Sequence, residues 1–267
     1  MWRGRTVSVI FPTYNEKDSI RAAIQEFFAT GVVDEIVVVN NNAVPGTSEE
    51  VAGTGAREVH EPRQGYGYAI QRGFREATGD LIIVAEPDGT FVGRDVLKLL
   101  VYSDDFDVVY GTRTTWELIW EGANMGMFLR WGNWAVAKLI EVLFNTTSLS
   151  DVGCTMRLID RRALERIQPY FTVGGSHFGP EMMLLSLLHG LRIVQIPVNY
   201  RRRVGQSMVT GDFWKAVRLG LRMILLVLEY RLRSLWSRDP RFGRGLPPEV
   251  RRRRRPTGDP IQEKLTL

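Results

Sequence analysis

The chain has 267 residues, of which 44% are hydrophobic and 24% charged, a composition that excludes a wholly disordered or collagen-like protein. Its 35 basic and 30 acidic residues give a net charge of +5. The single cysteine, Cys154, excludes an intrachain disulfide and a cysteine-based metal cluster, and it indicates a reducing compartment. We expect this thiol to be a small buried residue.

The first two thirds of the chain alternate predicted strands with predicted helices. Short β-branched and apolar runs predict buried strands at 7–11, 36–39, 58–59, 81–84, 107–110 and 193–198. Apolar residues at helical spacing predict helices at about 20–28, 47–52, 70–77 and 94–102, the first of them capped by Asp18 or Ser19. This order predicts an α/β fold with a doubly wound, mostly parallel sheet flanked by helices.

Polar and acidic residues follow two of these strands directly. Pro12-Thr13-Tyr14-Asn15-Glu16 ends the first strand, and Glu86-Pro87-Asp88 follows the strand at 81–84. Because ligands of such sheets bind at the carboxyl ends of the strands, we expect the two segments to meet at one edge. A carboxylate pair there can hold a divalent cation against a diphosphate. The alternatives are a helix-capping turn at the first segment and a plain Asp-Gly turn at the second.

Two later segments depart from the strand–helix alternation. Residues 116–147 and 213–236 contain six of the seven tryptophans. The second is predicted to be one long helix with a stripe of charged residues and a wide apolar face. Its longest uncharged run has six residues, Met223–Leu228, far below the roughly 20 needed to cross a bilayer. We expect this helix to lie in a membrane interface, with packing on the core or on a partner as the alternative.

The basic character of the chain lies in its last 31 residues. Residues 237–267 contain nine basic and four acidic residues, five prolines and the run Arg251–Arg255, whereas residues 1–236 are neutral overall. We predict a disordered basic tail that is either solvated or held on anionic lipid. Without a basic folded face, nucleic-acid binding is not expected. The predicted organisation is a catalytic domain at 1–210, an amphipathic interface helix at 211–236 and the tail at 237–267.

Seven short motifs occur in an order that resembles the family 2 glycosyltransferases with a GT-A fold, and within them the polyprenyl-phosphate (dolichyl-phosphate) hexose synthases. They are Phe11-Pro12-Thr13-Tyr14-Asn15-Glu16, Val37-Val38-Val39-Asn40-Asn41-Asn42, Gly65-Tyr66-Gly67-Tyr68-Ala69, Glu86-Pro87-Asp88-Gly89, Gly111-Thr112-Arg113, Asp151-Val152-Gly153-Cys154-Thr155-Met156-Arg157 and Gly205-Gln206-Ser207. The resemblance covers about residues 5–235. It implies an inverting transfer of a hexose from a UDP- or GDP-sugar to a polyprenyl phosphate, with Mg²⁺ or Mn²⁺ as the cofactor.

The resemblance also implies a donor site. Asp88 is expected to ligate the metal, and Glu86 to be a second ligand in a place where the family often has Asp. The nucleoside is expected to be lined by Pro12, Thr13, Asn15 and Glu16, and by Asn40 and Asn41, which stand where the family commonly carries acidic residues. Gly65 lets the backbone approach the ligand closely, and Arg63 is expected to meet phosphate.

A phosphate acceptor arrives ionised and needs arginines rather than a general base. By resemblance these are Arg113, Arg130, Arg201, Arg202 and Arg203, with Ser207 nearby, although Met208 stands where the subfamily usually has Lys. Asp151 and Arg157 are expected to order a loop beside the sugar. With Asp88, we assign Arg113, Arg130 and Asp151 to catalysis. Glu181-Met182 lacks the second carboxylate of the pair that relatives using a hydroxyl acceptor tend to show.

Two other functions stay open from the sequence. One is transfer to a hydroxyl of a glycan or glycolipid, and the other is a non-catalytic scaffold that binds nucleotide sugars. A dinucleotide oxidoreductase is not expected, because no Gly-x-Gly-x-x-Gly follows the first strand. The chain shows no secretory signal, and we expect a peripheral protein on the cytoplasmic face of a membrane. A second copy of the chain is a further partner that the sequence leaves open.

Overall fold

The computed structural model of the chain describes residues 1–123, 127–205 and 213–242. The strands, in chain order, are β1 Val7–Thr13, β2 Glu35–Asn40, β3 Arg57–His60, β4 Leu81–Val84, β5 Val108–Thr112, β6 Arg157–Asp160 and β7 Ile193–Pro197. The α-helices are α1 Lys17–Phe28, α2 Thr47–Val51, α3 Tyr66–Glu76, α4 Asp95–Tyr102, α5 Met127–Phe144, α6 Arg161–Ile167, α7 Phe178–Leu188 and α8 Phe213–Trp236. Short 3-10 turns lie at Trp116–Leu118, Gln168–Tyr170 and Pro240–Phe242.

Within the described residues, seven strands form one sheet in the order β3-β2-β1-β4-β6-β5-β7. All neighbours run parallel except β6, which is antiparallel to both β4 and β5. Strand β1 lies in the middle of the parallel part, where Val9 is level with Ile36 on one side and Ile83 on the other. The carboxyl ends of β1, β2 and β4 therefore open onto the same edge of the sheet.

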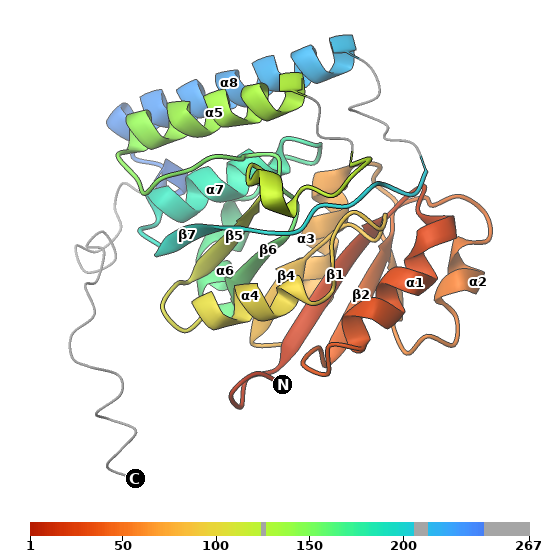
Figure 1. Ribbon diagram of the computed structural model, residues 1–267. Coiled ribbons are helices and arrows are strands. Elements are labelled where there is room, and N and C mark those ends of the chain that lie inside the picture. Colours follow the sequence, from red (N-terminus) through yellow and green to blue (C-terminus); the bar gives the residue numbers. More distant parts are fainter. Residues whose placement is uncertain (124–126, 206–212, 243–267) are drawn as a thin grey trace.

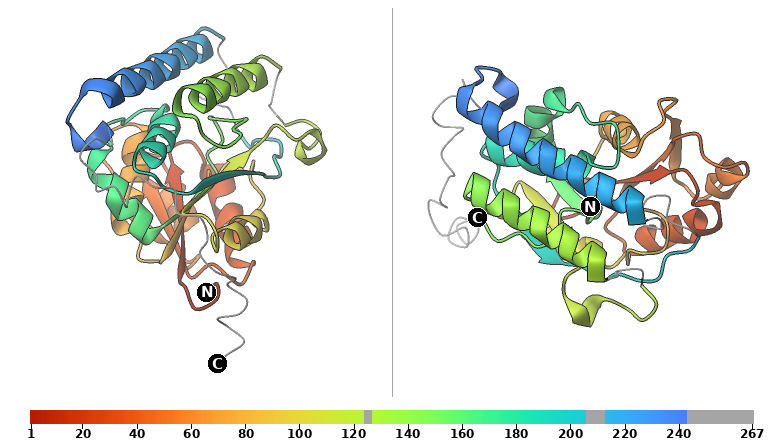
Figure 2. Two further views of the ribbon diagram at one scale, coloured as in Figure 1. Left: turned by 90° about the vertical axis from the view of Figure 1, so that its left-hand side faces the viewer. Right: turned by 90° about the horizontal axis from the view of Figure 1, so that it is seen from above.

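The sheet is covered on both faces (Figures 1 and 2), and its strand residues alternate between two hydrophobic clusters. Val7, Val9 and Phe11 of β1 pack with α1, α2 and α4, whereas Ile10 packs with α3, α6 and α7. Because successive side chains of a strand point to opposite faces, a strand that is buried on both faces must be apolar at nearly every position. This explains the nearly continuous apolar runs of β1 and β4.

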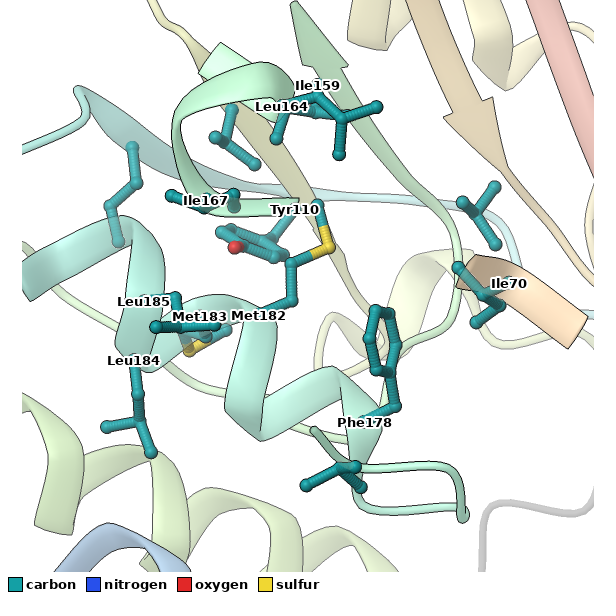
Figure 3. Packing of buried hydrophobic residues seen from close by; sticks show 14 of the residues in the cluster. Ile70, Tyr110, Ile159, Leu164, Ile167, Phe178, Met182, Met183, Leu184 and Leu185 are labelled. Carbon is teal, nitrogen blue, oxygen red and sulfur yellow. The ribbon is translucent and has the colours of Figure 1, made fainter. Parts of the chain in front are cut away.

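Helix α7 fills the space between the sheet and an outer pair of helices, α5 and α8 (Figure 1). Its residues Phe178 and Met182 lie close to Tyr110 of the sheet, and Leu184 lies on the side of the outer helices (Figure 3). Full burial of such side chains stabilises the fold by roughly 1.5–3 kcal/mol each. The outer helix α8 contributes three side chains to the same cluster: Met223, Val227 and Tyr230.

The predicted α/β architecture is confirmed, with some local differences. Helix α1 begins at Lys17, and its N-cap is Glu16 rather than Asp18 or Ser19. The sequence pattern did not predict β6 or α6. Helix α8 lies where a long helix was expected, and part of one face is packed on the core. Within the segment predicted as a tail, Phe242 is buried against Tyr230, and residues 238–240 are exposed. The Arg251–Arg255 run lies outside the described residues.

Candidate active site

The turn after β1 is organised by the side chain of Glu16. One carboxylate oxygen, Oε2, accepts hydrogen bonds from the backbone N–H groups of Tyr14 (2.7 Å) and Asn15 (2.8 Å), and from the hydroxyl of Thr13 (3.4 Å). The other oxygen, Oε1, lies 3.1 Å from Nη2 of Arg203. The carboxylate that was expected to meet the nucleoside therefore also fixes the turn that carries it.

The asparagines at the end of β2 hold the neighbouring loop. Asn41 is buried, and its amide donates to the carbonyl oxygens of Glu61 (2.7 Å) and Arg63 (2.8 Å) while its Oδ1 accepts from Gly65 N (2.8 Å). The φ of Gly65 is +153°, and a Cβ atom there would clash with the carbonyl oxygen of Gly174. Only glycine fits this close approach. Asn41 thus places the Gly65 turn beside the end of β1.

Two further donor-side residues already have protein partners. Asn40 accepts a hydrogen bond from Ala43 N and donates to Glu58, both at 2.8 Å. The guanidinium of Arg63 lies 3.0 Å from Glu61 and over the ring of Tyr68. The Arg63 hydrogen bond is the main reason that the pKa of Glu61 is lowered. A phosphate contact of Arg63 stays a prediction.

Asp88 is fully buried after β4 and has one oxygen that the described residues leave without a hydrogen bond. Its Oδ1 accepts from the backbone N–H (2.9 Å) and the hydroxyl of Thr90. Its Oδ2 accepts no hydrogen bond in the described parts of the chain, and it faces Nη1 of Arg203 at 3.0 Å as an ion pair. Buried carboxylate oxygens are normally satisfied, so this oxygen is a candidate ligand atom.

Glu86 lies beside Asp88, and its Oε2 is 3.6 Å from the same Nη1 of Arg203. The pKa of Glu86 is raised to about 8, first by burial and then by the neighbouring charge of Asp88, although Arg203 opposes both. Crowding of two carboxylates is relieved by positive charge. A pair of oxygen ligands in such surroundings fits a hard divalent cation.

Arg203 is held over these acids by its own backbone. The backbone N–H of Arg201 donates to the carbonyl oxygen of Thr90 (2.8 Å), and that of Val204 donates to the carbonyl oxygen of Asp88 (2.9 Å). The segment 201–204 therefore runs along the loop after β4. Burial lowers the pKa of Arg203, but the facing carboxylates, Asp88 first, outweigh it and the pKa is raised.

The candidate metal site contains two carboxylates rather than a closed protein cage. Among the residues that the structure describes, no group of three or more His, Cys, Asp and Glu side chains could hold a metal ion. Magnesium in particular binds through one or two carboxylates together with substrate phosphates. Oδ2 of Asp88, which accepts no hydrogen bond from the described residues, and the adjacent Glu86 fit that chemistry.

Arg113 and Asp151, both assigned to catalysis from the sequence, form a buried ion pair. Arg113 Nε and Nη2 lie 2.9 and 3.1 Å from the two oxygens of Asp151, and Gly153 N donates to the same carboxylate (2.9 Å). Burial raises the pKa of Asp151, but the Arg113 charge outweighs it and the net shift is downward. The pair holds the loop at 151–153, and a role of Asp151 beside the sugar stays a prediction.

Tyr200 is in contact with this ion pair and also feels the charges of the acids after β4. The Arg113 guanidinium lies over its ring, 5.1 Å from the centroid. Burial raises the pKa of Tyr200, Arg113 lowers it, and Glu86 and Asp88 raise it, so the ring lies within electrostatic range of both groups. The carboxylates and Arg113 therefore share one region of the molecule.

The other predicted arginines differ in their surroundings. Arg130 donates to the carbonyl oxygen of Thr114 (2.7 Å) and stacks on Trp116, 3.9 Å from the ring centroid. Arg157 is buried, donates to the carbonyl oxygens of Cys154 and Thr155, and makes no ion pair within the described parts of the chain. A buried guanidinium without a carboxylate is a candidate anion site.

The structure thus brings some of the predicted residues into direct contact and leaves others apart. Glu16, Glu86, Asp88 and Arg203 meet directly, while Arg202 is exposed and Ser207 lies outside the described residues. Pro12 and Thr13 are buried at the end of β1, and Asn15 is exposed. Sequence reasoning missed Thr90, although its position two residues after Asp88 is the spacing of a side-chain-capped turn.

Glu181, which stands where relatives using a hydroxyl acceptor tend to show an acidic pair, holds a loop through its carboxylate. It is fully buried and accepts hydrogen bonds from Thr172 N (3.0 Å), Val173 N (2.9 Å) and the Tyr230 hydroxyl (2.8 Å). The loop that it holds is the one whose Gly174 carbonyl accepts from the N-terminus of α3. Glu181 therefore connects α8 to the loop beside Gly65.

The sequence of the chain is similar to those of known glycosyltransferases. The family described as "Glycosyl transferase family 2" matches residues 8–168. A low-salt glycan biosynthesis hexosyltransferase, Agl6, of Haloferax volcanii is 30% identical over 227 residues, which are 81% of this chain but 53% of that protein, so the chain spans about half of its length. A dolichyl-phosphate hexose transferase of the same organism is 28% identical over 229 residues, 85% of this chain and 96% of that protein.

Among solved structures, glucosyl-3-phosphoglycerate synthase from Mycobacterium tuberculosis in complex with Mn²⁺, UDP and phosphoglyceric acid is similar in fold. The TM-score is 0.65 at 18% identity, over 91% of this chain and 80% of that chain. At this identity the likeness extends to the fold alone. The observed sheet is therefore of the GT-A kind that the motifs implied.

Proposed function

The chain belongs to glycosyl transferase family 2, and from this premise we propose that it moves a hexose from a UDP- or GDP-sugar to a polyprenyl phosphate at a membrane surface. The names of two relatives, a hexosyltransferase and a dolichyl-phosphate hexose transferase, support the choice of sugar and acceptor. Transfer by direct in-line displacement would invert the configuration of the anomeric carbon.

On the donor side, the residues after β1, β2 and β4 bind and orient the nucleotide sugar. Asp88 Oδ2, with Glu86 beside it, would hold Mg²⁺ or Mn²⁺, which when bound neutralises charge on the diphosphate. Thr90 keeps the Asp88 carboxylate in one orientation. The Asn41-held Gly65 turn brings backbone N–H groups close to the ligand. These groups act by positioning and by electrostatic complementarity.

One observation favours a phosphate acceptor over a hydroxyl. A hydroxyl acceptor needs a general base, and two carboxylates that could supply one, Asp151 and Glu181, are both engaged. Asp151 is paired with Arg113, and Glu181 is satisfied by Thr172, Val173 and Tyr230. A lipid monophosphate, with a second pKa of about 6, needs no such base. It needs arginines, and Arg130, Arg157 and Arg202 are available to it in this proposal.

The outer helices supply a membrane-facing surface. Helix α8 has three stripes: a buried one with Val227, a charged one with Arg218 and Arg222, and an exposed apolar one. The exposed apolar stripe consists of Trp214, Leu221, Leu225, Leu228, Leu232 and Leu235. Trp131 and Trp134 are exposed on α5, which packs beside α8 (Figure 2). Exposed leucines bordered by tryptophan and arginine suit the lipid headgroup region.

No helix in the described parts of the chain is long and apolar enough to cross a bilayer. Helices α5 and α8 lie on the membrane surface in this proposal, and the leucines of α8 are immersed to the depth of the headgroups. A lipid acceptor would then reach the site along the same surface. This places the reaction at the boundary between water, which supplies the nucleotide sugar, and lipid, which supplies the acceptor.

The decisive experiment supplies both substrates. Purified protein is incubated with Mn²⁺ or Mg²⁺, a polyprenyl phosphate and a panel of UDP- and GDP-hexoses, and the lipid phase is analysed by mass spectrometry. The expected product is a polyprenyl monophosphate carrying one hexose. A product glycosylated on a hydroxyl would replace this proposal with the hydroxyl acceptor, and no transfer or hydrolysis with any donor would favour a binding scaffold.

A further inference from the structure

Arg203 holds the position that a cation would be expected to take. Its guanidinium reaches Glu16 after β1 (3.1 Å) and both acids after β4, Glu86 (3.6 Å) and Asp88 (3.0 Å). These three carboxylates come from two different strand ends and would repel one another without it. The side chain of Arg203 is 23% exposed and that of Asp88 0%, so solvent screens the contact only weakly.

A divalent ion and this guanidinium compete for the same oxygen. A metal ligated by Asp88 would be held directly by a carboxylate oxygen, as hard cations are in proteins. Asp88 Oδ1 is already engaged by Thr90, which leaves Oδ2, the atom that faces Arg203. Two positive groups crowded onto one buried oxygen are unfavourable, so one must leave.

The backbone around Arg203 allows its side chain to leave alone. Hydrogen bonds from Arg201 N and Val204 N to the loop after β4 hold the segment in place on both sides of it. A released guanidinium stays tethered beside the site, and an arriving diphosphate offers it new oxygens to bind.

We propose that Arg203 is the resident counter-cation of the metal site. It keeps Glu16, Glu86 and Asp88 assembled before ligands bind, and it yields Asp88 to a divalent ion. Because a nucleoside diphosphate supplies the released guanidinium with a new partner, the metal binds weakly by itself and strongly together with the nucleotide. This inference rests on the proposed metal-dependent transfer and adds an order to the loading of the site.

The test consists of two titrations with Mn²⁺, one with the protein alone and one with UDP or GDP present. Electron paramagnetic resonance measures the free ion in both. Arg203→Gln removes the charge, so it should lower the Kd of Mn²⁺ alone on the order of tenfold. The factor by which the nucleotide increases the affinity for Mn²⁺ should shrink by a similar amount. Arg203→Lys, whose ammonium cannot bridge Glu16 and Asp88 together, should change both quantities in the same direction by less.

Arg201→Gln is the matched control, because Arg201 lies in the same segment but pairs with Glu26. It should leave the Mn²⁺ affinity unchanged. Thermal melting identifies which variants are folded. If Arg203→Gln is unfolded, the Mn²⁺ affinity of Arg203→Lys is the deciding measurement. Mn²⁺ affinity that does not rise when Arg203 is replaced overturns the inference, including the case in which Mn²⁺ binds no variant.

The same measurements distinguish failure of this inference from failure of the proposed function. Wild-type protein that forms the glycolipid while the Arg203 variants bind Mn²⁺ no tighter defeats the counter-cation inference alone. Variants that bind Mn²⁺ more tightly, in a protein that forms no glycolipid, defeat the proposed function alone.

Discussion

Asp88 and Asp151 are both completely buried carboxylates, yet their surroundings give them different roles. Asp151 is satisfied on both oxygens by Arg113 and Gly153, as structural charges are. Asp88 is satisfied on one oxygen, and its other oxygen faces a side chain that can move. Incomplete satisfaction of a buried polar atom is costly, and proteins tolerate it mainly where a ligand will complete it.

Replacement of Asp88 by Asn tests the first role. Asparagine keeps an acceptor for Thr90 but removes the negative charge that would bind a metal. We expect the transfer rate to fall by about 10²–10³-fold, the scale of losing one electrostatic contact in a transition state. We expect little change in melting temperature. Asp104→Asn, at an exposed carboxylate paired with Arg3, is the control, and full activity of Asp88→Asn in excess chelator would contradict the metal role.

Replacement of Asp151 by Asn tests the second role. It leaves the Arg113 guanidinium buried without a counter-charge, which costs about 3–5 kcal/mol of unfolding free energy. The pKa of Asp151 is lowered in the fold, so its contribution is complete at neutral pH and is lost as the pH falls below about 4. Urea unfolding at pH 7 and at lower pH should therefore show a gap between wild type and variant that narrows in acid. An unchanged gap would contradict the ion-pair assignment.

Arg130 is the arginine whose assignment to the acceptor is easiest to separate from folding. Its contacts are a carbonyl oxygen and the face of Trp116, with no carboxylate among the described residues. Arg130→Ala should raise the half-saturating concentration of polyprenyl phosphate by about tenfold and that of the nucleotide sugar much less. Steady-state kinetics with each substrate varied measures both. Arg3→Ala, which removes another arginine near a tryptophan, is the control, and equal effects on both substrates would refute the assignment.

At the scale of elements, the strands with long apolar runs were predictable because burial on both faces leaves a nearly continuous signal in β1, β2 and β4. Helix α7 was not predictable from periodicity, since nine successive residues, Phe178–Ser186, are buried and no polar face interrupts them. Strand β6 has four residues, and its antiparallel direction depends on β4 and β5, which lie far away in sequence.

The same argument applies to the candidate site. The proximity of residues at strand ends could be predicted from the sequence, because parallel strands end at one edge. The side chains that pair with them could not be predicted, because Arg203 and Glu16 are separated by 187 residues and Arg113 and Asp151 by 38. Which side chain satisfies which is decided by tertiary packing.

The link between α8 and the loop at 172–174 is one such contact, and its strength can be measured. The Tyr230 hydroxyl donates to the Glu181 carboxylate, a bond to a charged group that contributes about 1.5–3 kcal/mol. Tyr230→Phe should lower the unfolding free energy by that amount. Tyr110→Phe removes a neutral hydroxyl–hydroxyl bond to Ser186 and should cost about 0.5–1.5 kcal/mol. Chemical denaturation of both variants measures the difference, and an equal cost would contradict a stronger hydrogen bond at Glu181.

At the scale of the whole molecule, the sheet separates two kinds of surface. One face is covered by α1, α2 and α4, and beyond the other lie α5 and α8 with their exposed tryptophans and leucines. Such a concentration of large apolar side chains on one side is the mark of an interaction surface. Its position sets how the active site would be oriented to whatever that surface binds.

A vesicle-binding experiment tests this orientation. Leu225→Glu with Leu232→Glu places two charges in the exposed stripe of α8, and binding to vesicles with 30% anionic lipid should fall by at least about tenfold. Leu97→Glu, on the exposed side of α4, is the matched control and should bind like wild type. Sedimentation or flotation measures the bound fraction. Equal binding by all variants would exclude α8 as the membrane contact.

Cys154 is the only cysteine, and its side chain is packed in the core against Gly111. Burial raises the pKa of its thiol to about 12, so almost none of it is thiolate at neutral pH. The wild-type chain is therefore already a background for site-directed labelling. A cysteine introduced at any exposed position of α5 or α8 would be the one reactive thiol, and nitroxide probes placed along both helices could report their immersion depth and tilt residue by residue.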